Sequence, residues 1–143
     1  MARALRGFAS SHRDNPGRFN VHDDHGFRVI VDYAHNPAAL RAVGQVVERL
    51  RPRVGRVIGV VSIPGDRRDE DIREMGEIAA GLFDELVFRE RPDGRGRVTG
   101  EVVALLTEGA LAAGFPRRVC TGFSASRGRS TRACAWLGRA IWS

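Results

Sequence analysis

Apolar runs that suit strands alternate with amphipathic helical stretches from residue 27 onward. Short apolar runs at three places predict strands, at residues 28–33, 57–63 and 85–89. Apolar residues recur at helical spacing in three further segments, at 37–50, 69–83 and 100–113. This alternation predicts a layered, Rossmann-like α/β domain with a mostly parallel sheet. We expect the first run, RVIVDY, to be a strand of the buried type.

The three predicted helices each carry an apolar stripe. Asn36 suits the N-cap of the first helix, and Pro37 suits its first helical position. Acidic residues crowd the first turns of the second helix, where they interact favourably with the helix dipole. In chain order, the three stripes are Leu40, Val43, Val47 and Leu50; Ile72, Met75, Ala79 and Leu82; and Val103, Leu106, Ala110 and Ala113.

Two further features flank this pattern. Ahead of it, two strand-like runs surround Asp24-His25-Gly26, which predicts a hairpin. The histidines and aspartates at 22–25 are metal-capable, but we expect a polar turn there and no metal site. After Pro116 we expect a brief strand at 118–121.

Charge is distributed unevenly along the chain. All 23 basic residues are arginine, and the formal net charge is +6. The segment from residue 109 onward holds six arginines and no acid, so the whole excess lies there. We interpret residues 122–143 as an atypical arginine-rich tail. Three alternatives remain open for this segment: a basic tail, a weak helix at 131–141, or translation of a GC-rich gene in the wrong reading frame. We expect it to add little stability.

The absence of lysine excludes two kinds of chemistry. A G-x-x-x-x-G-K-[ST] phosphate loop and a Schiff base both need a lysine amine. Cys120 and Cys134 lie outside metal-type spacing and suit free thiols in a reducing compartment. No secretory signal is apparent and no apolar run reaches 18 residues, so we expect a cytoplasmic location and no membrane partner.

Three motifs stand in order within the α/β pattern. They are NPGR at 15–18, DYAHNP at 32–37 and GDRRD at 65–69. Together they resemble the C-terminal domain of Mur ligases, over roughly residues 13–119, and within that family the cyanophycin synthetase branch more than the peptidoglycan or folate branches. The family's later GDLVVL-type strand is not visible after residue 121, so we expect a domain that is incomplete at its C-terminus.

The resemblance implies an ATP-dependent acid–amino acid ligase. Such an enzyme activates a carboxylate as an acyl phosphate, and an incoming amine then displaces the phosphate. In the cyanophycin synthetase branch, arginine is joined to an aspartate side chain. A central domain would carry the phosphate loop and hold most of the ATP and Mg²⁺. We therefore expect residues 1–17 to be the end of that domain or a linker, 18–121 to be the C-terminal domain, and the chain to be inactive alone.

The same resemblance implies site residues, although no catalytic residue is expected in the isolated chain. The predicted nucleotide-binding residues are Arg18, Asp32, His35 and Asn36, and the predicted substrate or phosphate residues are Asp66, Arg67 and Arg68. Each has a structural alternative: a turn acceptor at Asp32, a surface histidine at 35, helix initiation at 36–37, and a solvated charge cluster at 66–69.

Two other functions are alternatives at this stage. One is a non-catalytic module of the same fold that binds a nucleotide or an amino acid. The other is RNA or polyanion binding through the arginine-rich tail, which would depend steeply on salt concentration. We expect nucleic acid not to be a partner, because the body of the chain up to residue 108 is electrically balanced. The pattern gives no indication of the oligomeric state.

Overall fold

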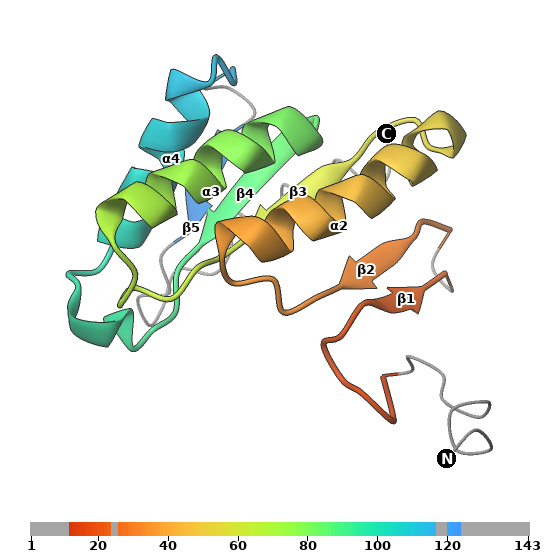
Figure 1. Ribbon diagram of the computed structural model, residues 1–143, viewed down its shortest axis with the longest axis horizontal. Helices are drawn as coiled ribbons and strands as arrows, with labels where there is room; N and C mark the ends of the chain where they lie inside the picture. The colour runs from red at the N-terminus through yellow and green to blue at the C-terminus, as the bar shows by residue number, and fades with distance from the viewer. Residues whose placement is uncertain (1–11, 24–25, 117–119, 124–143) are drawn as a thin grey trace. The chain divides into compact units, whose positions relative to one another are not determined.

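The computed structural model describes residues 12–23, 26–116 and 120–123 (Figure 1). The chain divides into two compact units, Met1–Ala34 and His35–Ser143. In the described part of the chain, no helix is long and apolar enough to cross a membrane. Residues 122 and 123 of the predicted tail belong to a strand described below, whereas its residues 124–143, like the first eleven residues of the chain, lie outside the described residues.

The first unit contains a two-stranded antiparallel hairpin. Strand β1 (Asn20–His22) pairs with β2 (Val29–Val31), with Asn20 opposite Val31. This confirms the predicted hairpin, whose turn residues 24 and 25 lie outside the described part. The expectation that the run at 28–33 is a buried strand of a parallel sheet is wrong. Val31 is 44% exposed, because each side chain of a two-stranded antiparallel ribbon has few cross-strand neighbours to cover it.

The second unit is built on a parallel sheet. Strands β3 (Ile58–Val61), β4 (Glu85–Arg89) and β5 (Cys120–Phe123) are neighbours in that order, and both pairings are parallel. The predicted parallel α/β architecture is therefore confirmed in this unit. Strand β3 is shorter than the predicted 57–63. Of the strand predicted at 118–121, residues 118 and 119 lie outside the described part, and β5 contains the other two and continues to Phe123.

Three helices pack in this unit, and α3 lies between the other two (Figure 1). Their bounds are α2, Pro37–Leu50; α3, Asp69–Leu82; and α4, Glu101–Ala112. Helix α3 connects β3 to β4, and α4 connects β4 to β5. Short 3₁₀ turns at Arg51–Arg53 and Gly94–Gly96 precede β3 and α4. Each predicted helix is present to within a residue of its predicted ends.

The core lies between α3, α4 and the sheet. Its largest fully buried apolar side chains are Phe88, Ile63, Ile72, Met75, Leu86 and Leu106. The helices approach closely where each carries a glycine: a Cβ at Gly76 would lie 2.1 Å from the Leu106 carbonyl oxygen, and one at Gly109 would lie 2.0 Å from that of Arg73. The backbones therefore touch without intervening side chains.

The predicted stripes of α2 and α3 are buried or partly buried, with Val43, Leu50 and Leu82 the partly buried members, but the predicted stripe of α4 is partly wrong. Val102 and Leu105 are buried, whereas Ala113 is exposed and Val103 only partly buried. Apolar residues occupy most positions of α4, so spacing alone cannot fix its buried face. The contact at Gly109 sets the rotation of the helix instead.

Candidate functional site

In the first unit, the loop that carries Arg18 is held by the buried side chain of Asn20. The Asn20 side chain, 1% exposed, accepts from Gly17 N at 2.6 Å and donates to the Asn15 carbonyl at 3.0 Å. Phe19 has a φ of 51°, which is unusual for a residue with a side chain. Its amide donates to Asp32 Oδ2 at 3.0 Å. Asn20 and Asp32 together fix a strained turn next to Arg18.

Arg18 projects from this turn and is exposed. Its guanidinium carbon lies 5.5 Å from the centroid of the Tyr33 ring, which is cation–π range. Tyr33 is itself 55% exposed, so the pair forms a surface feature of the unit. The structure brings the predicted residues Arg18 and Asp32 into the same loop region. In that region Asp32 acts as a turn acceptor, which was the alternative to its predicted nucleotide contact.

At the start of the second unit, Asn36 caps α2. Its side chain accepts from Ala39 N at 2.8 Å, and Pro37 occupies the first helical turn, as predicted. No acid lies in that turn, so the positive end of the helix dipole is not neutralised there. His35 is half-buried beside it. A helix start of this kind attracts anions, although helix initiation also accounts for Asn36.

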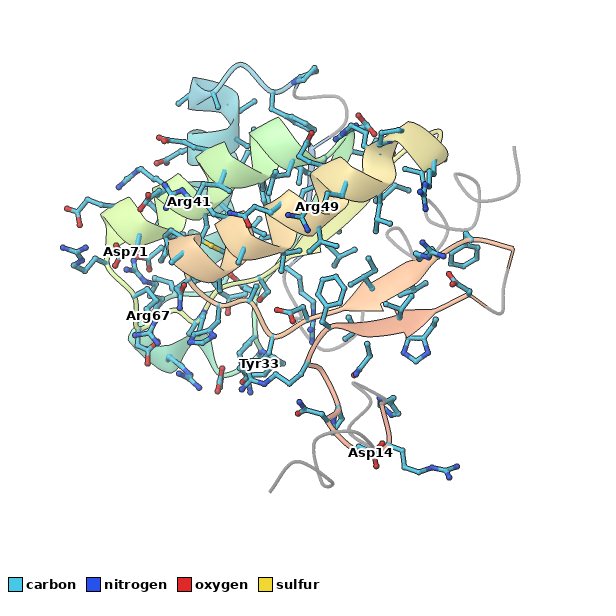
Figure 2. The ribbon with its side chains drawn as sticks, turned by 45° about the vertical axis from the view of Figure 1, so that its right-hand side comes forward. Asp14, Tyr33, Arg41, Arg49, Arg67 and Asp71 are labelled. Atoms are coloured by element: carbon cyan, nitrogen blue, oxygen red, sulfur yellow. The ribbon has the colours of Figure 1, made fainter. Side chains whose placement is uncertain are left out.

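The loop between β3 and α3 carries the other three predicted residues. Asp66 pairs with Arg95 at 3.0 Å, and Arg68 pairs with Asp71 at 2.8 Å. The hydrogen bond between Arg68 and Asp71 lowers the pKa of the Asp71 carboxyl and raises the pKa of Arg68. Arg67 is exposed (Figure 2). Within the described residues, its guanidinium makes no hydrogen bond or ion pair.

The loop between β4 and α4 contributes residues that sequence reasoning missed. Arg97, only 15% exposed in its side chain, donates to the Gly65 carbonyl at 2.6 Å and to Asp69 at 2.7 Å. Hydrogen bonding to Asp69 raises the pKa of Arg97. Glu90, 4% exposed, accepts from Gly100 N at 2.6 Å. The available signal was the arginine-rich stretch at 91–97, directly after a predicted parallel strand.

In the second unit, the loops at the carboxyl ends of β3 and β4 bring arginine and carboxylate side chains together. Ligands of open α/β sheets bind at this edge. Arg67 and Arg68 are both exposed in the β3–α3 loop, but Arg68 pairs with Asp71, and the α2 start is a further electropositive element of the same unit. Across the residues that the structure describes, no cluster of three or more His, Cys, Asp or Glu side chains could hold a metal ion. The arrangement suits phosphate or carboxylate oxygens.

Comparison with known proteins supplies the family. The family model described as "Mur ligase, glutamate ligase domain" matches residues 17–121. The chain is 44% identical over 111 residues to a cyanophycin synthetase of Synechocystis sp., covering 78% of this chain and 12% of that protein. It is 46% identical over 105 residues to a cyanophycin synthetase of Trichormus variabilis, covering 73% of this chain and 11% of the relative.

A peptidoglycan-branch relative is more distant. The UDP-N-acetylmuramoyl-L-alanyl-D-glutamate–2,6-diaminopimelate ligase of Geobacter metallireducens is 35% identical over 127 residues, covering 85% of this chain and 24% of that protein. The chain thus spans about an eighth of the length of the cyanophycin synthetases that it matches. The family match covers most of the chain and includes all three motifs except the first two residues of NPGR. This chain belongs to the Mur ligase family, as a glutamate ligase domain similar to that of cyanophycin synthetases.

Proposed function

We propose that the chain acts as the C-terminal domain of an ATP-dependent ligase that joins arginine to an aspartate side chain. The similarity to cyanophycin synthetases over 78% of this chain supports the reaction type. In such a reaction, a carboxylate becomes an acyl phosphate and the arginine amine displaces phosphate to form the amide. The domain would work in the cytoplasm with a central domain that supplies the lysine this chain lacks.

The observation that carries this proposal is the state of Arg67. The neighbouring charges are engaged, Asp66 with Arg95 and Arg68 with Asp71, whereas Arg67 is exposed without an ion pair among the described residues. An arginine fork can bind two phosphate or carboxylate oxygens at once. We assign Arg67 to the phosphates of ATP or to the acyl phosphate.

The other predicted residues have supporting roles in this proposal. The start of α2, with His35 and Asn36, would bind a phosphate oxygen through the Ala38 amide, because Pro37 has no amide hydrogen and the Ala39 amide donates to Asn36. Arg18 would approach the phosphates as the domains close, and Asp32 would accept from a ribose hydroxyl. The described residues fit the anionic part of ATP, and Mg²⁺ would be held mainly by the central domain and the phosphates.

An ADP titration of the chain tests the assignment. We expect the amide signals of residues 65–68 and of Asn36, Ala38 and Ala39 to shift in NMR spectra as ADP is added. Arg67→Ala should weaken ADP binding about tenfold, the loss typical of one charge-assisted hydrogen bond. Arg53→Ala is the matched control, because Arg53 is also exposed but lies in the turn that precedes β3, at the other end of that strand.

The control also separates specific binding from general attraction. Both variants lose one positive charge, so polyanion binding through net charge would weaken equally in both. Equal ADP affinities of the two variants would contradict the assignment of Arg67 and favour non-specific binding.

A further inference from the structure

The two loops at the carboxyl ends of β3 and β4 are joined by one arginine. Arg97, in the β4–α4 loop, donates from Nε to the Gly65 carbonyl at 2.6 Å and from Nη2 to the Arg67 carbonyl at 2.7 Å. Both carbonyls belong to the β3–α3 loop, some thirty residues earlier in the chain. Arg97 therefore holds the backbone on both sides of Asp66, at Gly65 and at Arg67.

Carboxylates complete the surroundings of Arg97. Nη2 also donates to Asp69 at 2.7 Å, and Nη1 donates to Glu101 at 2.5 Å. Asp69 and Glu101 open α3 and α4, so the guanidinium ties the starts of both helices to the loop. With these four bonds, Arg97 has used most of its donors, and its side chain is only 15% exposed. Arg97 is therefore better suited to holding protein groups in place than to binding a ligand.

Two further contacts join the same loops. A Cβ at Gly65 would lie 2.2 Å from the Gly94 carbonyl oxygen, so the two backbones touch there. Arg95 has a left-handed backbone, with φ of 47°, and its side chain reaches Asp66 at 3.0 Å. A strained residue in the loop indicates that the surroundings determine its conformation. The backbone of Arg67 is thus fixed while its guanidinium stays exposed.

We infer that Arg97 is a positioning residue that fixes the β3–α3 loop so that Arg67 is presented to an anion at the carboxyl edge of the sheet. The inference rests on the proposed function for the anion, and on the hydrogen bonds of Arg97 for the loop. A lysine at 97 would keep the charge but could not reach both carbonyls and both carboxylates from one nitrogen.

Amide hydrogen exchange of the full chain tests whether Arg97 holds the loop. The Arg67 amide donates to the Pro64 carbonyl at 3.3 Å, and in Arg97→Lys we expect this amide to exchange about tenfold faster, while the amides of α3 and β4 keep their protection. Arg51→Lys is the matched control, because Arg51 also bridges a carboxylate and a carbonyl, those of Asp84 and Leu82, which precede β4. It should leave the Arg67 amide unchanged. Unchanged exchange of this amide in Arg97→Lys would overturn the inference.

A double-mutant cycle tests whether Arg97 acts through Arg67. Arg97→Lys should weaken ADP binding about fivefold in the natural sequence and have little effect in the Arg67→Ala background. A purely structural role would weaken ADP binding equally in both backgrounds and would overturn the inference. A chain that binds no ADP at all would refute the nucleotide contact of the proposed function, and the exchange measurement would still decide whether Arg97 holds the loop.

Discussion

Replacing Gly76 with alanine should destabilise the second unit, because α3 and α4 touch at this residue. The added Cβ would lie 2.1 Å from the Leu106 carbonyl oxygen and 3.0 Å from the Ala110 amide nitrogen. The first distance is about 1.3 Å short of the 3.4 Å at which ordinary contact begins. Both contacts are with the backbone of α4, so no side chain can rotate away and the helices must separate.

The magnitude follows from two opposing effects. Overpacking of a well-packed core costs about 1–3 kcal/mol, and a backbone clash belongs at the upper end of that range. Alanine in place of a helical glycine returns about 1 kcal/mol. The net loss is therefore about 2 kcal/mol, which lowers the melting temperature by roughly 8 °C in a domain of this size.

Thermal and urea unfolding followed by circular dichroism measure the effect. Gly81→Ala is the matched control, since Gly81 lies in the same helix and a Cβ there meets nothing within 4 Å. That variant should be as stable as the natural sequence or up to about 1 kcal/mol more stable. If Gly76→Ala were as stable as Gly81→Ala, the close contact between α3 and α4 would be refuted.

Three further predictions follow from local contacts and composition. Asn36→Ala removes the acceptor for Ala39 N and should cost about 1 kcal/mol in urea unfolding, whereas Asn36→Asp should not; equal losses would contradict the capping role. Partial burial raises the pKa of Asp84, but hydrogen bonds from Val57 N and Arg51 outweigh it and leave the pKa below its ordinary value. The lowered pKa stabilises the folded state above about pH 3.9, and this stabilisation is lost as the pH falls through the folded-state pKa. In Asp84→Asn, the free energy of unfolding should therefore decrease less steeply on the acid side. An unchanged dependence of the free energy of unfolding on pH would contradict this role of Asp84. The purified chain should release no ADP from ATP with any peptide acceptor, because it has no lysine and no phosphate loop; ADP release that depends on Asp32 would overturn this.

Local sequence signals predict much of the second unit. The bounds of α2 and β4 agree with the prediction, because the Asn36-Pro37 cap and the short apolar run at 85–89 act within a few residues. The buried face of α4 depends on contacts distant in sequence, because spacing alone cannot show that Gly109 turns α4 toward α3. The pairing of β1 with β2 was predicted from the turn residues between them, but the exposure of Val31 was not.

Some residues of the candidate site could be predicted from the sequence, and others could not. The motif at 65–69 identified Arg67, which the structure places exposed at the carboxyl end of β3. Arg97 was not identified, because its importance arises only when parallel pairing of β3 and β4 brings two loops together. Asn20 was also missed, since an asparagine at the start of a strand gives no sign that its amide will be buried beneath a turn.

A segment exchange in a complete enzyme tests the proposed ligase function of this domain. Residues 17–121 of this chain would replace the matching segment of the Synechocystis cyanophycin synthetase, to which this chain is 44% identical over 111 residues. We predict that the purified chimera releases ADP in an arginine-dependent manner, and that Arg67→Ala in the exchanged segment lowers this rate at least about tenfold while Arg53→Ala does not. A folded chimera with no more arginine-dependent ADP release than an enzyme lacking the segment would contradict the proposed ligase function.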